Sequence, residues 1–250
     1  CWELATSSPL GRQQLKDQTI RKEKTLINID HSKARYLLDG FNGEAIPEEL
    51  AGSFRAFLAI ENLYVSATRE ISTKLENLND EFKTNMDRNP IHEIKTRVKT
   101  PRSIMNKLLR KGHEISVESA RTNLDDIAGV RVICSYIDDT RMIADLLTSQ
   151  DDITLLRKSD YISNPKPNGY RSLHLVVTVP VFLLKSTEHV KVEVQIRTIA
   201  MDFWASLEHD LAYKLPKEKA GKLIDELKEC ADVINQTDER MQKLFNILIT

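Results

Sequence analysis

The sequence predicts an α+β fold: a mixed sheet of roughly five strands flanked by helices, with long helices before and after it. Segments 171–179 and 189–197 alternate like strands, and 129–136 is rich in β-branched residues. Segments beginning near residues 48 and 217 carry apolar residues at helical spacing. The 250 residues, 41% hydrophobic and 29% charged, suit a globular protein with one large domain or with a domain and helical extensions.

The N-terminal part divides into a polar arm and a long helix. Residues 1–30 are polar and show no sustained hydrophobic period, and residues 39–47 resemble a turn-rich linker, so we expect 1–45 to form a poorly ordered arm. Pro47, followed by two glutamates, favours a helix start, because proline fits the first turn and acidic groups stabilise the positive end of the helix dipole. A near-heptad apolar stripe continues to Phe82, and Pro90 marks the end of the helix. The main domain, 46–215, is expected to begin with this helix.

The middle of the chain alternates between helices and strands. Residues 91–113 are strongly basic, and Pro101 predicts a strand-like or loop segment at 95–100 followed by a helix from about 101 to 111. Beyond these we expect a helix at 117–127, a buried strand at 129–136, an amphipathic helix at 138–147 and a strand at 153–162.

The last third of the chain predicts a strand pair and two helices. Pro180 and a polar tip separate the final two strands, which favours an antiparallel pair. A helix over 198–213 follows, and another over 217–248 carries a heptad stripe. That stripe fits either a contact between chains or packing on its own domain, so residues 216–250 are assigned to packing or oligomerisation.

The bulk composition narrows the class of protein. A formal net charge of −1 gives no whole-molecule attraction to nucleic acid or an anionic membrane, so any basic site must be local. The longest apolar run, residues 173–184, is too short and interrupted to span a bilayer. Cys1, Cys134 and Cys230 are too scattered for a disulfide framework, and Cys134 is interpreted as a buried thiol. We therefore expect a cytoplasmic protein with no membrane partner.

The strand at 189–197 places polar residues on one face and apolar residues on the other. The polar positions are Lys191, Glu193, Gln195 and Arg197. If this strand pairs with the one before it, His174 and Glu193 share a polar face. On alternation alone, a sheet with one solvated face is the simpler interpretation.

Three features point beyond that interpretation to a site for nucleotides. The first is a constrained turn with Pro165, Pro167 and Asn168-Gly169, which presents Lys166 and Tyr170 at the rim of the sheet. An exposed tyrosine ring beside a lysine suits stacking on a base and holding a phosphate. The alternative is an ordinary hairpin loop with a packed tyrosine.

Carboxylates and cations supply the other two features. The pair Asp125-Asp126 directly precedes a strand, and a carboxylate from this pair with Glu193 offers the minimum set for Mg²⁺. That ion takes one or two carboxylates and fills its other positions with water and phosphate oxygens. The phosphate-binding candidates are Arg97, Lys99, Ser103 and Lys107. The alternatives are a solvated helix end for the acid and a solvated basic face for the cations.

These residues lie in motifs that resemble those of the small alarmone synthetases, the single-domain (p)ppGpp synthetases of the RelA/SpoT homologue superfamily. The likeness covers roughly residues 50–215, and the order and spacing of the motifs together are highly specific. The matching segments are Arg97-Val-Lys99 with Ser103-Ile-Met-Asn-Lys107, Asp126-Ile-Ala-Gly-Val-Arg131, Asp160-Tyr-Ile, Lys166-Pro-Asn-Gly-Tyr170-Arg-Ser-Leu-His174, Glu193-Val-Gln-Ile-Arg-Thr198 and Phe203-Trp-Ala-Ser-Leu-Glu-His209.

The resemblance implies a nucleotidyltransferase-like sheet and transfer of pyrophosphate from ATP to the ribose 3′-hydroxyl of GDP or GTP, with release of AMP. The implied ATP-binding residues are Arg97 and Arg131 for the adenine, and Lys99, Ser103 and Lys107 for the phosphates. The implied acceptor-binding residues are Tyr170, stacked on the guanine, with Lys166, His174 and Gln195. The implied catalytic and Mg²⁺-binding residues are Asp126 and Glu193.

Alternatives stay open at this point. Glu193 could accept the ribose proton or mainly orient the hydroxyl through the metal. The sequence does not separate GDP, GTP and GMP as acceptors, and Asp202 stands where some relatives have an asparagine near the guanine. Two other functions fit these residues. One is a non-catalytic module that binds a guanine nucleotide or single-stranded RNA, and the other is a different Mg²⁺-dependent nucleotidyltransferase. Relatives of this size form homotetramers, so a homo-oligomer is expected.

Overall fold

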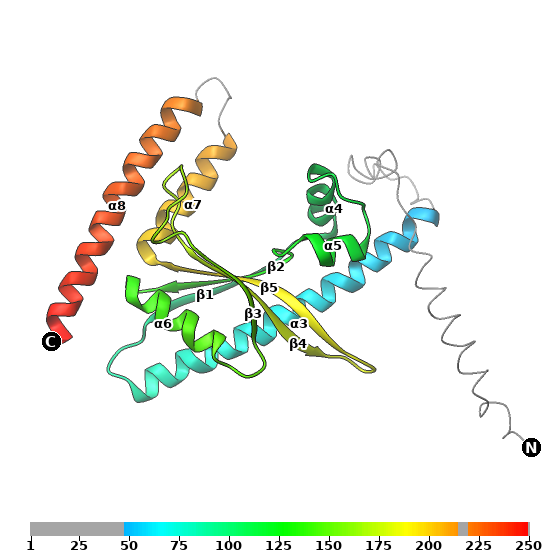
Figure 1. Ribbon diagram of the computed structural model, residues 1–250, viewed down its shortest axis with the longest axis horizontal. Helices are drawn as coiled ribbons and strands as arrows, with labels where there is room; N and C mark the ends of the chain where they lie inside the picture. Colours follow the sequence, from blue (N-terminus) through cyan, green and yellow to red (C-terminus); the bar gives the residue numbers. More distant parts are fainter. Residues whose placement is uncertain (1–47, 215–219, 250) are drawn as a thin grey trace, which may run out of the picture. The chain divides into compact units, whose positions relative to one another are not determined.

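The computed structural model contains helices and strands in the predicted order (Figure 1). It describes residues 48–214 and 220–249, so the predicted arm lies outside the described residues. The elements are α3 (Glu48–Asn85), β1 (Ile91–Val98), α4 (Pro101–Arg110), α5 (Val117–Asn123), β2 (Ala128–Cys134), α6 (Ile137–Thr148), β3 (Thr154–Asp160), β4 (Leu173–Phe182), β5 (Thr187–Thr198), α7 (Ile199–Lys214) and α8 (Ala220–Ile249).

The chain forms two compact units. Among the described residues, the smaller contains 48–60 and 101–123, which are the start of α3 together with α4 and α5. Its apolar side chains Ile104, Met105 and Leu108 are buried along one face of α4. The larger unit contains the described residues 61–100, 124–214 and 220–249, and with them all five strands of the sheet.

The sheet has five strands in the order β1-β2-β5-β4-β3. Strands β2 and β5 are parallel, and the other three neighbouring pairs are antiparallel. The predicted α+β fold with a mixed five-stranded sheet is therefore confirmed. The predicted β4–β5 hairpin is also confirmed, and Leu183 N–H closes its turn by donating to Ser186 O at 2.8 Å.

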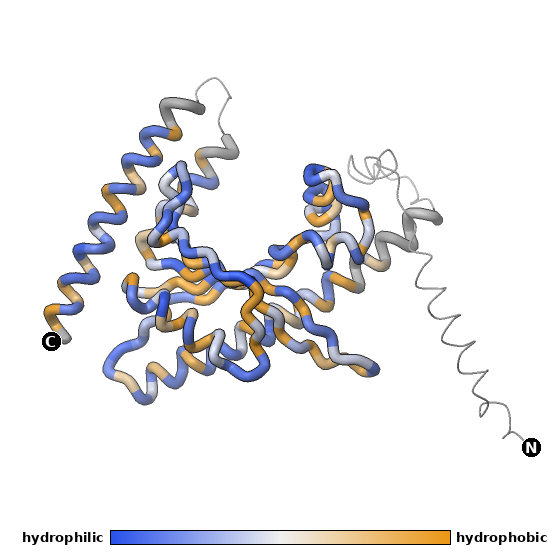
Figure 2. The backbone as a smooth tube through the Cα atoms, viewed as in Figure 1, coloured by the Kyte–Doolittle hydropathy of each residue, from blue (hydrophilic) through white to orange (hydrophobic). Residues whose placement is uncertain are grey.

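One face of the sheet is apolar and forms the core. On β5 the side chains of Val190, Val192, Val194 and Ile196 are all buried, and β4 matches them with Leu173, Leu175, Val177 and Val179. Helix α6 contacts β2, β4 and β5, and its Ile143 and Leu147 are fully buried. Figure 2 shows the resulting concentration of hydrophobic residues on the central strands. Burial of each such side chain contributes about 1.5–3 kcal/mol, which leaves the opposite face free to carry polar groups.

Helix α7 begins at Ile199 because Thr198 caps it. Thr198 Oγ1 accepts from Met201 N–H at 3.1 Å and donates to Asp238 Oδ2 on α8 at 2.6 Å. Helix α8 also buries Ala231 and Gln242, whose Oε1 accepts from Asp138 N–H at the start of α6. Helix α8 therefore contacts α6 and α7, although much of its surface stays exposed, and its assignment to packing or oligomerisation stays a prediction.

Two expectations drawn from composition can be compared with the structure. Cys134 is fully buried, as predicted. Within the described part of the chain, no helix combines the length and apolar character that crossing a membrane requires.

Candidate active site

The polar face of the sheet carries two rows of side chains that run from β1 to β4. Residues paired across neighbouring strands project to the same face, so the strand register sets each row. The first row is Lys95, Arg131, Gln195 and His174, and the second is Arg97, Gly129, Glu193 and Val176. Because Gly129 has no side chain, a space opens between Arg97 and Glu193.

A cavity of about 410 Å³ occupies this space. Its lining includes six of the predicted site residues: Arg97, Lys99, Asp126, Arg131, Glu193 and Gln195. Small-molecule sites typically enclose about 300–1,000 Å³. The sheet therefore brings three predicted ATP-binding cations and both predicted metal-binding carboxylates into one place.

Lys99 and Asp126 form an ion pair in the wall of the cavity. Lys99 follows β1 and Asp126 precedes β2, and a bond of 2.8 Å from Lys99 N–H to Ile127 O extends the strand pairing to this point. Lys99 Nζ donates to Asp126 Oδ2 at 3.0 Å and to the main-chain oxygen of Asp126 at 2.8 Å. A phosphate at this position would meet a cation beside the carboxylate that is predicted to bind metal.

Glu193 is engaged through both carboxylate oxygens. His174 Nδ1 lies 3.3 Å from Oε1, and Gln195 Nε2 donates to Oε2 at 2.9 Å. Burial raises the pKa of Glu193, but the hydrogen bonds from His174 and Gln195 outweigh burial, so its pKa lies below the ordinary value. Glu193 is therefore ionised at neutral pH, and the prediction that it shares a face with His174 is confirmed.

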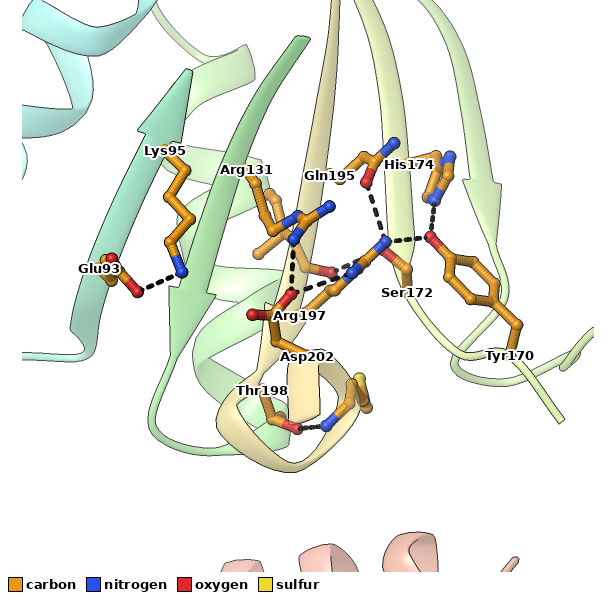
Figure 3. A network of polar contacts seen from close by, with 12 residues as sticks. Glu93, Lys95, Arg131, Tyr170, Ser172, His174, Gln195, Arg197, Thr198 and Asp202 are labelled. Atoms are coloured by element: carbon orange, nitrogen blue, oxygen red, sulfur yellow. Dashed lines mark hydrogen bonds and ion pairs between the residues drawn. The ribbon is translucent and has the colours of Figure 1, made fainter. Parts of the chain in front are cut away.

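Two further side chains close these contacts into a ring of hydrogen bonds. Tyr170 Oη lies 2.8 Å from His174 Nε2, and Arg197 Nη2 donates to Tyr170 Oη at 2.6 Å and to Gln195 Oε1 at 2.9 Å (Figure 3). Because ionised Glu193 can only accept, the contact at His174 Nδ1 requires a proton on that nitrogen, and in the tautomer protonated only there Nε2 accepts from the tyrosine hydroxyl. Each contact in the ring then joins one donor to one acceptor, which fixes the orientation of all five side chains.

Asp202 connects this ring to Arg131 in the cavity wall. Its Oδ1 accepts from Arg131 Nη1 and from Arg197 Nη1, both at 3.0 Å (Figure 3). The Arg197 side chain is only 5% exposed, whereas that of Arg131 is 35% exposed. Sequence reasoning placed Arg197 on the polar face but assigned it no role, and it did not predict that Asp202 contacts both arginines.

Lys166 lies between two aromatic rings in the loop that precedes β4. Its Nζ is 4.7 Å from the ring centroid of Tyr161 and 4.7 Å from that of Tyr170, a cation–π arrangement. Tyr170 is half-buried rather than exposed as predicted, because its hydroxyl joins the ring of hydrogen bonds. Tyr161 was missed as a site residue, although it lies within the Asp160-Tyr-Ile motif.

Ser103 and Lys107 lie on α4, in the smaller compact unit. They are four residues apart and therefore project from the same face of the helix. Ser103 is exposed and Lys107 is half-buried. Their predicted part in phosphate binding stays a prediction.

The donor set in the cavity fits Mg²⁺ bound together with a nucleotide. Within residues 48–214 and 220–249, no group of three or more His, Cys, Asp or Glu side chains could hold a metal ion by itself. The cavity does hold the carboxylates of Asp126 and Glu193. The negative charge of Asp126 acts to raise the pKa of Glu193, although less than burial does, so the two carboxylates are close enough to interact. Mg²⁺ often takes only one or two carboxylates, with water and phosphate oxygens as its other ligands.

Comparison with known proteins agrees with these motifs. A family described as "Region found in RelA / SpoT proteins" matches residues 96–218. The chain is 47% identical over 179 residues to GTP pyrophosphokinase YwaC of Bacillus subtilis (strain 168), covering 72% of this chain and 85% of that protein. It is 36% identical over 184 residues to GTP pyrophosphokinase YjbM of the same organism, covering 72% of this chain and 84% of that protein.

Solved structures give the same result. The crystal structure of small alarmone synthetase 1 from Bacillus subtilis, bound to its product pppGpp, matches with a TM-score of 0.71 and 33% identity, covering 78% of this chain and 100% of that one. Small alarmone synthetase 2 from Bacillus subtilis matches with a TM-score of 0.66 and 43% identity, covering 75% of this chain and 97% of that one. The chain therefore belongs to the small alarmone synthetases of the RelA/SpoT family.

Proposed function

We infer that the protein is a GTP pyrophosphokinase. It transfers the pyrophosphate group of ATP to the 3′-hydroxyl of GDP or GTP and forms AMP and (p)ppGpp, the alarmone of the stringent response. The observation that carries this inference is the cavity in which Arg97, Lys99 and Arg131 lie beside Asp126 and Glu193. Cations and metal-binding carboxylates in one place are what phosphoryl transfer requires, since it depends mainly on alignment and charge neutralisation.

The ATP half of the site is proposed to lie on β1 and β2. Arg97 and Arg131 come from these neighbouring strands, and planar guanidinium groups stack well on an adenine ring. Lys99 is proposed to neutralise phosphate charge, together with Ser103 and Lys107 of α4. Stacking between arginines gives binding without a glycine-rich phosphate loop.

Asp126 and Glu193 are proposed to hold Mg²⁺. When bound, the ion supplies positive charge to the phosphate oxygens during transfer. Lys99 already provides a fixed cation beside Asp126, so the chain itself contributes part of that neutralisation.

The acceptor half is proposed to lie on β4, β5 and the loop before β4. Tyr170 would stack on the guanine, with Lys166 and His174 near its phosphates and Gln195 next to Glu193. Glu193 can accept a hydrogen bond from the 3′-hydroxyl and direct its oxygen at the β-phosphorus of ATP. The new bond joins the 3′-oxygen to that phosphorus, the bond to the oxygen of AMP breaks, and the proton passes to Glu193 or to water.

Incubation with Mg-ATP and GTP or GDP tests the reaction. AMP and a guanine nucleotide carrying two more phosphates should appear together. Glu193→Gln and Asp126→Asn should each reduce turnover by about 100-fold or more, since each removes a charge on which alignment depends. Glu188→Gln, on the same strand as Glu193 but outside the cavity lining, is the matched control and should keep normal turnover. Near-normal turnover in either of the first two variants would contradict the assigned roles.

The products also separate the alternative functions. Release of pyrophosphate instead of AMP would indicate a different nucleotidyltransferase. RNA binding with a steep salt dependence and no AMP would indicate a binding module. Tyr170→Ala should mainly weaken the guanine acceptor, and an unchanged acceptor KM would contradict stacking.

We also propose that the protein is a homo-oligomer, a tetramer by resemblance. Apolar side chains of α7 and α8 stay exposed beside a cavity of about 600 Å³, including Ile199 at 46%, Phe203 at 58% and Met241 at 49%. Contiguous exposed apolar groups mark interaction surfaces, and a second copy of the chain is the proposed occupant. Light scattering that showed a stable monomer at micromolar concentration would contradict this. A cytoplasmic location stays a prediction.

A further inference from the structure

The loop at 165–171, called the acceptor loop below, carries Lys166 and Tyr170 in a tight, self-bonded turn. Gly169 N–H donates to Lys166 O at 2.8 Å, and Lys166 N–H donates to Tyr170 O at 3.1 Å. The side chain of Asn168 spans the glycine, since its Oδ1 accepts from Tyr170 N–H at 3.2 Å. Gly169 has a φ of 89°, a backbone conformation that residues other than glycine rarely adopt. The loop therefore has a definite shape of its own.

Helix α8 lies directly against this turn. A Cβ atom added to Gly169 would lie 2.5 Å from Ala231 Cβ and 3.6 Å from Lys228 Cα. Ordinary van der Waals contact begins near 3.4 Å, so any side chain at Gly169 would have to move the loop or the helix by about 1 Å. The loop and the helix thus fit only because both residues at the contact are small.

The surroundings of this contact hold the loop to both C-terminal helices. Trp204, Ala205 and Ala231 form a buried cluster against which Tyr170, Leu227 and Ile234 pack. Trp204 Nε1 donates to Leu227 O at 2.8 Å, which ties α7 to α8 below the loop. Polar contacts flank the cluster: Asn168 Nδ2 donates to Glu208 Oε1 at 3.3 Å, and Arg171 Nη2 lies 3.5 Å from Asp232 Oδ1.

We propose that α8 is a positioning element for the acceptor nucleotide, and that Gly169 and Ala231 are its positioning residues. The inference rests on the proposed function, because it takes Tyr170 as the platform for guanine. Tyr170 is fixed at two ends: its hydroxyl by His174 and Arg197, and its ring by the cluster on α7 and α8. Moving the loop by 1 Å would tilt the ring away from the position that the hydroxyl contacts define. Binding of the acceptor should therefore depend on α8, whereas binding of ATP should not.

A double-mutant cycle tests this dependence. Gly169→Ala introduces the clash with Ala231, and a misplacement of about 1 Å in a positioned group can cost up to about 100-fold, so we expect the acceptor KM to rise at least about tenfold. The KM for ATP should stay unchanged. Ala231→Gly removes the atom that clashes, so the double variant should recover much of the acceptor affinity, although Ala231→Gly alone gains nothing.

Gly112→Ala is the matched control for backbone strain. Gly112 also has a positive φ, of 69°, but a Cβ added there meets no atom within 4 Å. The control should reproduce the conformational cost of alanine at positive φ without changing the acceptor KM. Thermal unfolding of all four variants separates loss of fold from loss of positioning. A second route, Trp204→Phe, removes the bond to Leu227 O and should also raise the acceptor KM.

Three outcomes would overturn the proposal. These are an unchanged acceptor KM in Gly169→Ala, an equal rise in the KM for ATP, or a double variant no better than Gly169→Ala alone. If the wild-type protein forms no AMP, the proposed function fails instead. Calorimetric titration of the same variants with GDP then tests the contact independently. Weaker GDP binding by Gly169→Ala, restored in the double variant with Ala231→Gly, would support positioning by α8. GDP binding by Gly169→Ala equal to that of the wild type would overturn it.

Discussion

Replacing Asp202 by alanine is expected to destabilise the protein strongly, because it would leave a buried arginine without its counter-ion. The Arg197 side chain is 5% exposed, and its other acceptors, Gln195 Oε1 and Tyr170 Oη, are uncharged. Removing one partner of a buried ion pair typically costs about 3–5 kcal/mol. We therefore expect Asp202→Ala to lower the free energy of unfolding by about that amount.

Two companion variants use the same carboxylate to test the reasoning. Arg131→Ala removes the other ion pair of Asp202, but the Arg131 side chain is 35% exposed, so its loss should cost about 1 kcal/mol or less. Asp202→Asn keeps an oxygen that can accept from Arg197 and loses only the charge, so its effect should lie between the other two. The expected order of destabilisation is therefore Asp202→Ala, then Asp202→Asn, then Arg131→Ala.

Urea unfolding followed by circular dichroism measures all three differences. The protein concentration must be the same throughout, because the stability of an oligomer depends on it. Equal destabilisation by Asp202→Ala and Arg131→Ala would refute the argument, since it would mean that burial of Arg197 does not set the cost. A destabilisation by Asp202→Ala below about 1 kcal/mol would refute it as well.

Three further predictions follow from single side chains. Tyr170→Phe keeps the ring but loses the two hydroxyl contacts, so unfolding should become easier by about 1–3 kcal/mol in urea titrations. Its acceptor KM should rise, but by less than in Tyr170→Ala, because the ring is still held by the cluster on α7 and α8; a KM as high as that of Tyr170→Ala would contradict this. Burial raises the pKa of Asp238, and the hydrogen bond from Thr198 only partly opposes this. The stability that the protonated Asp238 side chain contributes is therefore fully present below the pKa of the unfolded chain, and it is lost as pH rises through the higher pKa of the folded protein. The difference in Tm between Asp238→Asn and the wild type should therefore shift in favour of the variant as pH rises from mildly acidic to neutral. A Tm difference that does not change with pH would contradict this prediction. Burial also raises the pKa of the Cys134 thiol, so a thiol reagent should label exposed Cys230 in the native protein and Cys134 only after unfolding; rapid native labelling of Cys134 would show that the strand opens.

The strands and their two faces were predictable because alternation is a property of the local sequence. Burial of Val192 and Val194 with Glu193 on the opposite face follows directly from the period of a strand. Boundaries were less predictable: β1 begins at Ile91, four residues before the predicted segment, and α5 ends at Asn123 rather than continuing to 127. Leu124 and Ile127 are three residues apart and both buried, a spacing typical of a helix, but in the structure they belong to the segment that connects α5 to β2.

The site was predictable only in part, because its closure depends on contacts between distant segments. The motifs located the cavity-lining residues, and pairing of the last two strands placed His174 beside Glu193. Nothing local indicates that Arg197 turns inward to bond Tyr170, or that Asp202 on α7 balances it. The contact between Gly169 and Ala231 could not be predicted from the sequence either, since a glycine after an asparagine is typical of any tight turn.

The parallel pairing of β2 with β5 has a consequence for the order in which the molecule forms. Helix α6 and strands β3 and β4 lie between the two in the chain, and such non-local pairing slows folding. Until β5 joins it, β2 presents an unpaired edge that can pair with strands of other chains. Both Arg131 and Glu193 need this pairing to reach one cavity. A growing chain therefore cannot form this cavity until the ribosome has released residues through Thr198.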